Sequence, residues 1–309
     1  MKFVIVSPRQ SAGGPIVLHA LCKYINELGY DAKIFYNKSW EYKEDQKCRY
    51  WFEWFRQTIH DALRCFRAKA LKQKSPKLNG YIDESVKGCP RKYLPFIDDD
   101  TVVIYPEIMY GNPLKARNVV RWFLYHNRFD DSAYGENDLF VCYREVFNDW
   151  RLNPNGYVLQ TPYYDLERYI QKNFGERTGK CYILRKGKNR IDCPSYVDGI
   201  IIDDLSENDK VRVFNECEYC ISYDTQTAYA TIAALCGCIS IVIPEIGKNK
   251  SDYKGANEVS YGVAWGFSEE EIAFAKKTRN KIVSMYEELN KNSIDSTRKF
   301  IRYCENYFN

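Results

Sequence analysis

The chain has 309 residues, of which 45% are hydrophobic and 28% are charged, and its formal net charge is +4. This composition is typical of a globular protein with two domains, and it excludes disordered chains, fibrous proteins and strongly basic nucleic-acid binders. The apolar opening at residues 2–8 is too short for a signal peptide, and no run of about 18 apolar residues would span a membrane. We therefore expect a cytoplasmic protein that binds no nucleic acid and keeps its 12 cysteines as reduced thiols.

The first 36 residues have the pattern of a strand, a helix and a second strand. Residues 2–8 are β-rich, residues 16–30 carry apolar side chains at helical spacing, and residues 31–36 are again β-rich. This order predicts a parallel sheet with a crossover helix.

The pattern is interrupted between about residues 40 and 98. Nine basic residues and two acidic ones lie between Lys47 and Lys77. Apolar side chains in this stretch share one face of a predicted helix, and they are Trp51, Phe52, Phe55, Ile59, Leu63, Phe66 and Ala70. Two explanations remain open. The helix packs on the core with a solvated basic face, or Trp51, Phe55 and Arg56 form a patch for a membrane or an acceptor.

The strand and helix order resumes after residue 98. Apolar β-rich runs occupy residues 101–107, 119–127 and 138–144, and Asn112-Pro113 has the form of a helix start. A second series places strands within 180–188, 198–204, 218–223 and 238–245, with helices at 206–217 and after residue 223. Residues after Ser268 are mostly helical. We predict an α/β protein of two Rossmann-like domains, with a helical insertion in the first domain and a helical C-terminus.

Cys217 and Cys220 have a CxxC spacing, and Cys236 and Cys238 lie nearby. This arrangement is compatible with a zinc site. However, Cys220 and Cys238 fall inside apolar strand-like runs, which favours buried thiols that act as small hydrophobic residues. We therefore predict no metal site.

Two glycines and a cluster of cations follow predicted strands. Gly13 and Gly14 lie between a strand and a helix, where they allow the backbone to approach a ligand, although a plain tight turn explains them equally well. The chain lacks the GxGxxG pattern of dinucleotide-binding proteins, so a hydride-transferring enzyme is disfavoured. Arg185, Lys186 and Lys188 follow another strand, and they are either phosphate ligands or solvated surface charges.

The turn at residues 223–227 is rich in hydroxyl groups. We expect Asp224 to cap the following helix, which leaves the hydroxyls of Tyr223, Thr225 and Thr227 to be explained. A diphosphate at the helix start would accept hydrogen bonds from both threonines. Glu245 ends the next strand and would accept hydrogen bonds from sugar or ribose hydroxyls at the same edge.

Glu107 and His126 are the catalytic candidates of the first half. Each follows an apolar run, so each is placed to take a proton from an acceptor hydroxyl. A purely structural role at a strand end is the alternative for both residues. His19, within the first predicted helix, and His60, on the basic helix, are weaker candidates.

Four stretches resemble the GT-B glycosyltransferases, and more narrowly the small bacterial enzymes of capsule, O-antigen and related surface-polysaccharide loci. They are TVVIYPEIMYGNPLKARNVVRWFLYHN, YILRKGK, SYDTQTAYATIAALCGCISIVIPE and YGVAWG. The resemblance covers most of the chain outside residues 40–98. It depends on the order of the motifs rather than on a single diagnostic one.

The resemblance implies two Rossmann-like domains facing a cleft and a metal-independent hexosyltransferase or related transferase. Residues 1–155 would form the acceptor-side domain, residues 156–295 the nucleotide-sugar domain, and residues 296–309 a C-terminal helix that packs back on the first domain. The donor would be a nucleotide-diphosphate sugar, with a UDP-sugar expected, and no further cofactor would be needed. Arg185, Lys186, Lys188 and the Asp224–Thr227 turn would then contact the donor diphosphate.

The resemblance also implies an acceptor that is a glycan or a lipid-linked glycan, with peripheral contact to the inner face of the cell membrane. One departure limits the transfer of residue roles. The pair of glutamates eight positions apart that many retaining GT-B enzymes carry is absent, because Asp224 is followed by Ile232 and Glu218 by Gln226. A non-catalytic GT-B-like partner of a membrane glycan-assembly complex and another nucleotide-sugar enzyme, such as an epimerase, are the alternative functions.

Overall fold

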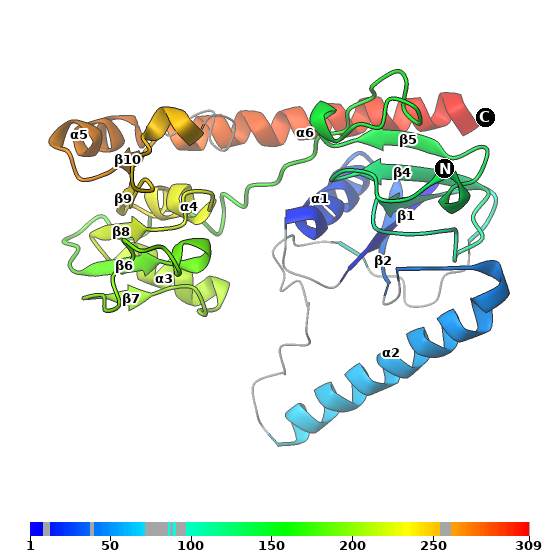
Figure 1. The fold of residues 1–309 in the computed structure, drawn as a ribbon, viewed down its shortest axis with the longest axis horizontal. Helices are drawn as coiled ribbons and strands as arrows, with labels where there is room; N and C mark the ends of the chain where they lie inside the picture. Colours follow the sequence, from blue (N-terminus) through cyan, green and yellow to red (C-terminus); the bar gives the residue numbers. More distant parts are fainter. Residues whose placement is uncertain are drawn as a thin grey trace. The chain divides into compact units, whose positions relative to one another are not determined.

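The computed structural model describes residues 1–8, 13–37, 40–71, 86, 89–90, 97–253 and 261–308. The chain divides into two compact units (Figure 1). Unit 1 comprises Met1–Tyr163 and Leu289–Asn309, and unit 2 comprises Tyr164–Glu288. The sequence analysis placed these divisions at 155/156 and 295/296.

Unit 1 is built on a five-stranded parallel sheet. Its strands are β1 (Lys2–Ser7), β2 (Asp31–Tyr36), β3 (Thr101–Pro106), β4 (Asn118–Phe123) and β5 (Leu139–Cys142). They lie in the order β2-β1-β3-β4-β5. Ile5 of β1 is in register with Ile34 of β2 and Ile104 of β3, so β-branched side chains form a continuous buried row across the sheet.

Helix α1 (Gly13–Glu27) packs in the core of unit 1 together with β1. Leu18, Leu21 and Ile25 recur at helical spacing and are fully or almost fully buried, as the sequence pattern predicts. The last turns of α6 (Lys281–Phe308) also enter this core through Phe300, Ile301 and Cys304. The C-terminal residues therefore contribute directly to the hydrophobic core of unit 1.

A second core cluster of unit 1 includes residues of the insertion. Helix α2 (Lys47–Ala70) contributes Tyr50 and Trp54, and the ring of Trp54 stacks on Phe35 of β2 with the centroids 5.7 Å apart. The predicted helical insertion is confirmed for residues 47–70.

Unit 2 contains a second five-stranded parallel sheet. Its strands are β6 (Lys180–Ile183), β7 (Ile200–Ile201), β8 (Tyr219–Ser222), β9 (Ile239–Val242) and β10 (Val263–Trp265), in the order β10-β9-β8-β6-β7. The helices α3 (Glu207–Glu216), α4 (Tyr229–Leu235) and α5 (Glu269–Thr278) follow β7, β8 and β10. Ser206 caps α3 as predicted, since its side chain accepts a hydrogen bond from the amide of Asp209.

The two sheets share one topology. When the strands are numbered within each unit, both orders read second, first, third, fourth and fifth. This is a doubly wound order in which the direction of the chain reverses between the first and third strands, at β1/β3 and at β6/β8. The predicted α/β fold class with two Rossmann-like units is therefore confirmed.

Short 3-10 helices complete the described structure, and they are η1 (Glu44–Gln46), η2 (Asp131–Ala133), η3 (Glu145–Phe147), η4 (Arg185–Gly187) and η5 (Lys250–Tyr253).

The helix predicted to start at Asn112-Pro113 is absent, and a turn occupies its place. The side chain of Asn112 binds both the amide and the carbonyl oxygen of Ala116, which stabilises the turn in place of helical hydrogen bonds.

The cysteine-rich segment of unit 2 is part of the hydrophobic core. Cys181, Cys217, Cys220, Cys236 and Cys238 are all buried in one cluster. Within the described ranges, no group of three or more His, Cys, Asp or Glu side chains is arranged to hold a metal ion. Of the helices in those ranges, none combines the length and the apolar character needed to cross a membrane.

Candidate functional site

The turn after β6 lies at the switch point of unit 2. Asp203, which follows β7, accepts hydrogen bonds from the amides of Leu184 at 3.2 Å and Arg185 at 2.7 Å. Arg185 has a positive φ of 33°, an unfavourable conformation for a residue with a side chain. Such strain is typical of functional positions that the surrounding structure over-determines. The carboxylate of Asp203 supplies that constraint here.

The cations of this turn are exposed and two of them extend toward the segment before α4. The guanidinium of Arg185 lies 5.5 Å from the ring centroid of Tyr229, and Lys186 Nζ lies 3.4 Å from Oε1 of Gln226. Lys188 is exposed as well. The structure thus brings Lys186 to the 223–227 segment and Arg185 to the first residue of α4, which the sequence could not show.

Gly187 allows the turn to approach the loop after β8. A Cβ atom at this position would lie 2.1 Å from the carbonyl oxygen of Tyr223, which no side chain would tolerate. The cationic turn and the 223–227 segment are therefore in direct backbone contact.

The 223–227 segment forms a turn, and Asp224 does not cap the helix that follows it. Oδ1 of Asp224 accepts a hydrogen bond from the amide of Gln226 at 3.0 Å, and Oγ1 of Thr227 accepts one from Tyr229 at 3.2 Å. Helix α4 begins at Tyr229, and its N-cap residue Ala228 makes no side-chain cap. The expectation that Asp224 caps this helix is wrong, because the chain forms a tight turn around Asp224 before the helix starts.

The residues of this segment differ in their exposure to solvent. Asp224, Thr225 and Thr227 are 3%, 7% and 8% exposed, whereas Tyr223 is half-buried. Asp224 already bonds to the backbone of the turn, and Thr227 to the amide of Tyr229, the first residue of α4. The exposed cations of the preceding turn are therefore more accessible to a ligand than the two threonine hydroxyls.

Arg190 joins three loops at this edge, and the sequence analysis missed it. Its guanidinium donates to the carbonyl oxygens of Tyr223 and Ile243 at 2.8 Å each and of Pro244 at 2.6 Å, and it pairs with Asp192 at 2.5 Å. The loops after β6, β8 and β9 therefore meet. The residue follows Lys188 by two positions, and nothing in the sequence distinguishes this structural cation from its exposed neighbours.

Glu245 lies in the loop after β9, three residues beyond the end of the strand. Its carboxylate pairs with Lys248, and its amide donates to the hydroxyl of Tyr253 at 2.8 Å. Tyr253 in turn stacks on Trp265 of β10 with ring centroids 4.8 Å apart. Glu245 is thus a half-buried carboxylate with one cationic partner.

A buried network supports the ring that Arg185 contacts. Glu207 accepts hydrogen bonds from the hydroxyls of Tyr229 and Tyr169 at 2.6 Å each and from Lys210 at 2.8 Å. Burial raises the pKa of the Glu207 carboxyl, but these donors outweigh it and the net pKa is lowered. The network therefore holds a charged carboxylate that anchors Tyr229 beneath the Arg185 guanidinium.

Glu107 lies at the switch point of unit 1, directly after β3. Its carboxylate is buried, with 8% of the residue exposed, and Oε2 accepts a hydrogen bond from the amide of Leu124 at 3.1 Å. Burial is the main influence on its pKa and raises it above the ordinary value. The amides of Glu107, Leu124 and Tyr125 and the charge of Arg128 lower the pKa to a smaller extent. A carboxylate with a raised pKa is a suitable proton acceptor near neutral pH.

The glycine pair lies against the same loop. Gly13 and Gly14 are the first residues of α1 rather than a loop before it. A Cβ on Gly14 would lie 3.4 Å from Cδ1 of Leu124, while nothing lies within 4 Å of a Cβ on Gly13. The first turn of α1 is therefore packed beside the residue whose amide binds Glu107.

Arg121 of β4 positions the loop that follows Glu107. It is buried and pairs with Asp138 at 2.6 Å, and it donates to the carbonyl oxygens of Met109 at 3.3 Å and Gly111 at 2.9 Å. The sequence analysis did not single out this ion pair. A charged residue within an apolar strand run was the available signal, since buried arginines are almost always paired.

His126 is exposed and lies two residues beyond Leu124. Its ring is 4.8 Å from the ring of Tyr125 and 5.2 Å from that of Phe147, measured between centroids. Glu107 and His126 follow the neighbouring strands β3 and β4, and the structure shows no hydrogen bond between them.

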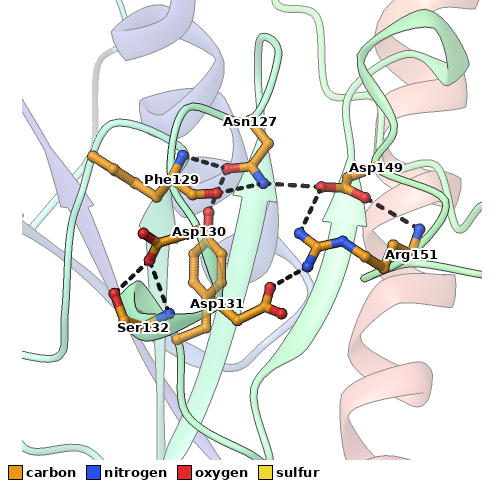
Figure 2. A network of polar contacts seen from close by, with 8 residues as sticks. Asn127, Phe129, Asp130, Asp131, Ser132, Asp149 and Arg151 are labelled. Atoms are coloured by element: carbon orange, nitrogen blue, oxygen red, sulfur yellow. Dashed lines mark hydrogen bonds and ion pairs between the residues drawn. The ribbon is translucent and has the colours of Figure 1, made fainter.

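The residue after His126 is held by a polar network (Figure 2). The amide group of Asn127 donates to Asp149 Oδ2 at 2.9 Å and accepts from Phe129 at 3.0 Å. Arg151 then pairs with Asp131 at 2.5 Å. These contacts connect the loops after β4 and β5 and restrict the position of the backbone beside His126.

His19 is buried and structural. Its Nδ1 lies 2.7 Å from the carbonyl oxygen of Pro15, and its Nε2 lies 2.8 Å from the hydroxyl of Tyr36.

The insertion residues Trp51, Phe55 and Arg56 lie on α2. Trp51 is half-buried against the second core cluster, whereas Phe55 and Arg56 are exposed.

No family model and no curated protein matches this chain. The chain is similar to the crystal structure of the glycosyltransferase VinC in complex with dTDP, with 10% sequence identity, coverage of 100% of this chain and 99% of that chain, and a TM-score of 0.34. It is also similar to the crystal structure of MurG from Acinetobacter baumannii, with 9% identity, coverage of 99% of this chain and 100% of that chain, and a TM-score of 0.30.

Proposed function

We propose that this protein is a glycosyltransferase that moves a sugar from a nucleotide-diphosphate sugar, a UDP-sugar in the first instance, to a hydroxyl of a glycan or lipid-linked glycan. The supporting observation is that both sheets share one doubly wound topology and carry complementary groups at their switch points. Ligands of such sheets bind at the carboxyl ends of the strands beside the switch point. Unit 2 has exposed cations there, and unit 1 has a buried carboxylate.

In unit 2 the cationic turn would bind the donor diphosphate. Arg185 and Lys186 are held near the 223–227 segment, and Lys188 adds a third exposed charge. Three cations stabilise the negative charge of a departing nucleotide diphosphate, so transfer in this proposal needs no essential divalent ion. Tyr223, Asp224, Thr225 and Thr227 shape the wall of the site, and Glu245 would accept hydrogen bonds from sugar or ribose hydroxyls.

In unit 1 Glu107 would act as the general base. The acceptor hydroxyl transfers its proton to the Glu107 carboxylate while its oxygen attacks the anomeric carbon of the donor sugar. The bond between that carbon and the diphosphate oxygen breaks, and its electron pair leaves with the nucleotide diphosphate. His126 is the alternative base, and the backbone at Gly13 and Gly14 would border the acceptor.

The role in bacterial surface-polysaccharide synthesis is supported by the sequence resemblance.

Calorimetry with UDP, dTDP and GDP, followed by incubation with the matching nucleotide sugars, tests the activity. We expect one nucleotide diphosphate to bind and to be released from its sugar during turnover. Failure of every nucleotide to bind would contradict the transferase and leave the non-catalytic partner. Conversion of the sugar without release of nucleotide diphosphate would indicate an epimerase.

A further inference from the structure

Helix α2 has two apolar faces, and the core of unit 1 uses one of them. Tyr50 and Trp54 are 4% and 5% exposed and lie in the core cluster beside β2. The indole of Trp54 donates to the carbonyl oxygen of Tyr36 at 3.2 Å, and the hydroxyl of Tyr50 donates to Oδ1 of Asn37 at 2.5 Å. These contacts anchor the first turns of the helix.

The second apolar face is exposed. It consists of Phe52 (66% exposed), Phe55 (47%), Ile59 (58%), Leu63 (62%) and Phe66 (74%). Successive members are three or four residues apart, so they form one stripe along the helix, which we call the exposed stripe. At 3.6 residues per turn, Tyr50 and Trp54 point to the opposite side of the helix. Packing on unit 1 therefore does not account for the exposed stripe.

Arginines follow one edge of the exposed stripe. Arg49, Arg56 and Arg67 are separated by 7 and 11 residues, which are close to whole numbers of helical turns, and all three are exposed. Arg56 pairs with Glu53 at 2.7 Å, while Arg49 and Arg67 form no ion pair with any residue in the described ranges. The apolar stripe thus has a positive border.

The form of this surface indicates its partner. A contiguous exposed apolar patch marks an interaction site. From Phe52 to Phe66 the exposed stripe extends over roughly 21 Å of helix, which fits a flat surface rather than a small ligand. A positive border beside apolar side chains is complementary to an anionic lipid surface, where the side chains enter the acyl boundary and arginines meet headgroup phosphates.

We propose that the exposed stripe of α2 docks unit 1 on a membrane surface that contains anionic lipids. The helix lies in the plane of the interface, with Phe52, Phe55, Ile59, Leu63 and Phe66 toward the acyl chains. This inference uses only the geometry of α2 and does not depend on the proposed transferase activity.

Flotation of the full chain with phosphatidylcholine vesicles, with and without phosphatidylglycerol, tests the inference. We expect the protein to float with the anionic vesicles and to float less as salt is raised. Phe55→Gln combined with Leu63→Gln and Phe66→Gln should reduce the partition coefficient at least about tenfold. Arg49→Glu with Arg67→Glu should reduce it about fivefold or more per arginine on anionic vesicles.

Matched controls distinguish binding through the exposed stripe from nonspecific hydrophobic binding to vesicles. Phe174 and Ile191 of unit 2 are 81% and 93% exposed, so Phe174→Gln with Ile191→Gln removes comparable exposed apolar surface elsewhere. That variant should float like the wild type, and circular dichroism should show that the triple variant retains its helices. Equal flotation of the triple variant and the wild type would overturn the inference. So would a wild type that ignores the vesicles and sediments as a dimer, because a second copy of the chain would then cover the stripe.

Discussion

The backbone amide of Leu124 donates a hydrogen bond of 3.1 Å to Oε2 of the buried Glu107. The bond joins the loops after β4 and β3, and it fixes the orientation of a carboxylate that burial makes more basic than usual. A fixed carboxylate with a raised pKa is the chemical feature of unit 1 that best suits proton transfer.

The pH dependence of transfer should follow Glu107. The base must be deprotonated, so the rate should fall as the pH decreases through a pKa above the usual 4.5 of a glutamate. Glu107→Gln should lower kcat by about 10²–10⁴-fold, because the amide cannot accept the proton. A pH–rate profile of the wild type and kcat of the variant are the measurements. If the acidic limb instead disappears in His126→Ala, His126 is the base.

The same substitution should not destabilise the protein at neutral pH. A carboxyl whose folded pKa is raised contributes most to stability below its unfolded pKa, and this contribution is lost as the pH rises through the folded pKa. Glu107→Gln removes the buried charge but keeps an oxygen for the Leu124 amide. Thermal unfolding should therefore show an equal or higher Tm for the variant at pH 7. A clear loss of Tm would mean that the carboxylate is structural.

Arg185 should contribute to binding and not to stability. Glycine adopts a positive φ without strain, so Arg185→Gly should change the free energy of unfolding by less than about 1 kcal/mol. Loss of the guanidinium should weaken nucleotide diphosphate binding about tenfold or more. Lys188→Ala removes a neighbouring charge without a change of backbone strain and should weaken binding as well. Calorimetric affinities that match the wild type for both variants would rule out nucleotide binding at this turn.

Asp203 should act on the nucleotide site through the backbone. Asp203→Ala leaves the amides of Leu184 and Arg185 without their acceptor and should cost about 1–3 kcal/mol of stability. Nucleotide affinity should fall even though Asp203 itself makes no contact with a ligand in this proposal. Asp204→Ala is the matched control, because its exposed neighbouring carboxylate makes no hydrogen bond to a described residue. Similar effects in both variants would contradict the positioning role.

Arg190 should be important for the stability of unit 2. Arg190→Ala removes the donor shared by the carbonyl oxygens of Tyr223, Ile243 and Pro244, so we expect a loss of about 2–4 kcal/mol in urea unfolding. Arg212→Ala removes an exposed arginine whose partner is Glu216 on the same helix, and should cost less than about 1 kcal/mol. A small effect at Arg190 would mean that the three loops are held together by other contacts.

The buried thiols should be unreactive in the native protein. Cys181, Cys236 and their neighbours in the core of unit 2 are buried, and burial raises the pKa of the Cys236 thiol to about 12. Cys48 is exposed and should react first with a disulfide reagent such as DTNB. The buried thiols should react only as the protein unfolds. A decrease in Tm with a zinc chelator would instead support a metal at the CxxC segment.

Local patterns were sufficient to predict the strands β1 to β9, but the short strand β10 (Val263–Trp265) was not predicted. The helical spacing of Leu18, Leu21 and Ile25 and the β-branched runs of both sheets identified strands and helices, because the period of apolar residues follows directly from helix and strand geometry. The start at Asn112-Pro113 was wrong because Asn112 bonds to Ala116 and stabilises a turn instead. Residues 72–85, 87–88 and 91–96 of the predicted insertion lie outside the described ranges.

The sequence by itself determined the α/β class, the parallel sheets and the amphipathic character of residues 47–70, since these depend on residue spacing along the chain. The tertiary structure decided which residues meet. Asp203 constrains Arg185, Arg190 joins three loops, and Leu124 binds Glu107, although each pair is separated by many residues. It also decided that Tyr50 and Trp54, rather than the stripe from Phe52 to Phe66, pack on unit 1. The first turns of α2 carry apolar side chains on both sides of the helix, so local hydrophobicity cannot show which side is buried, and only the position of the sheet determines it.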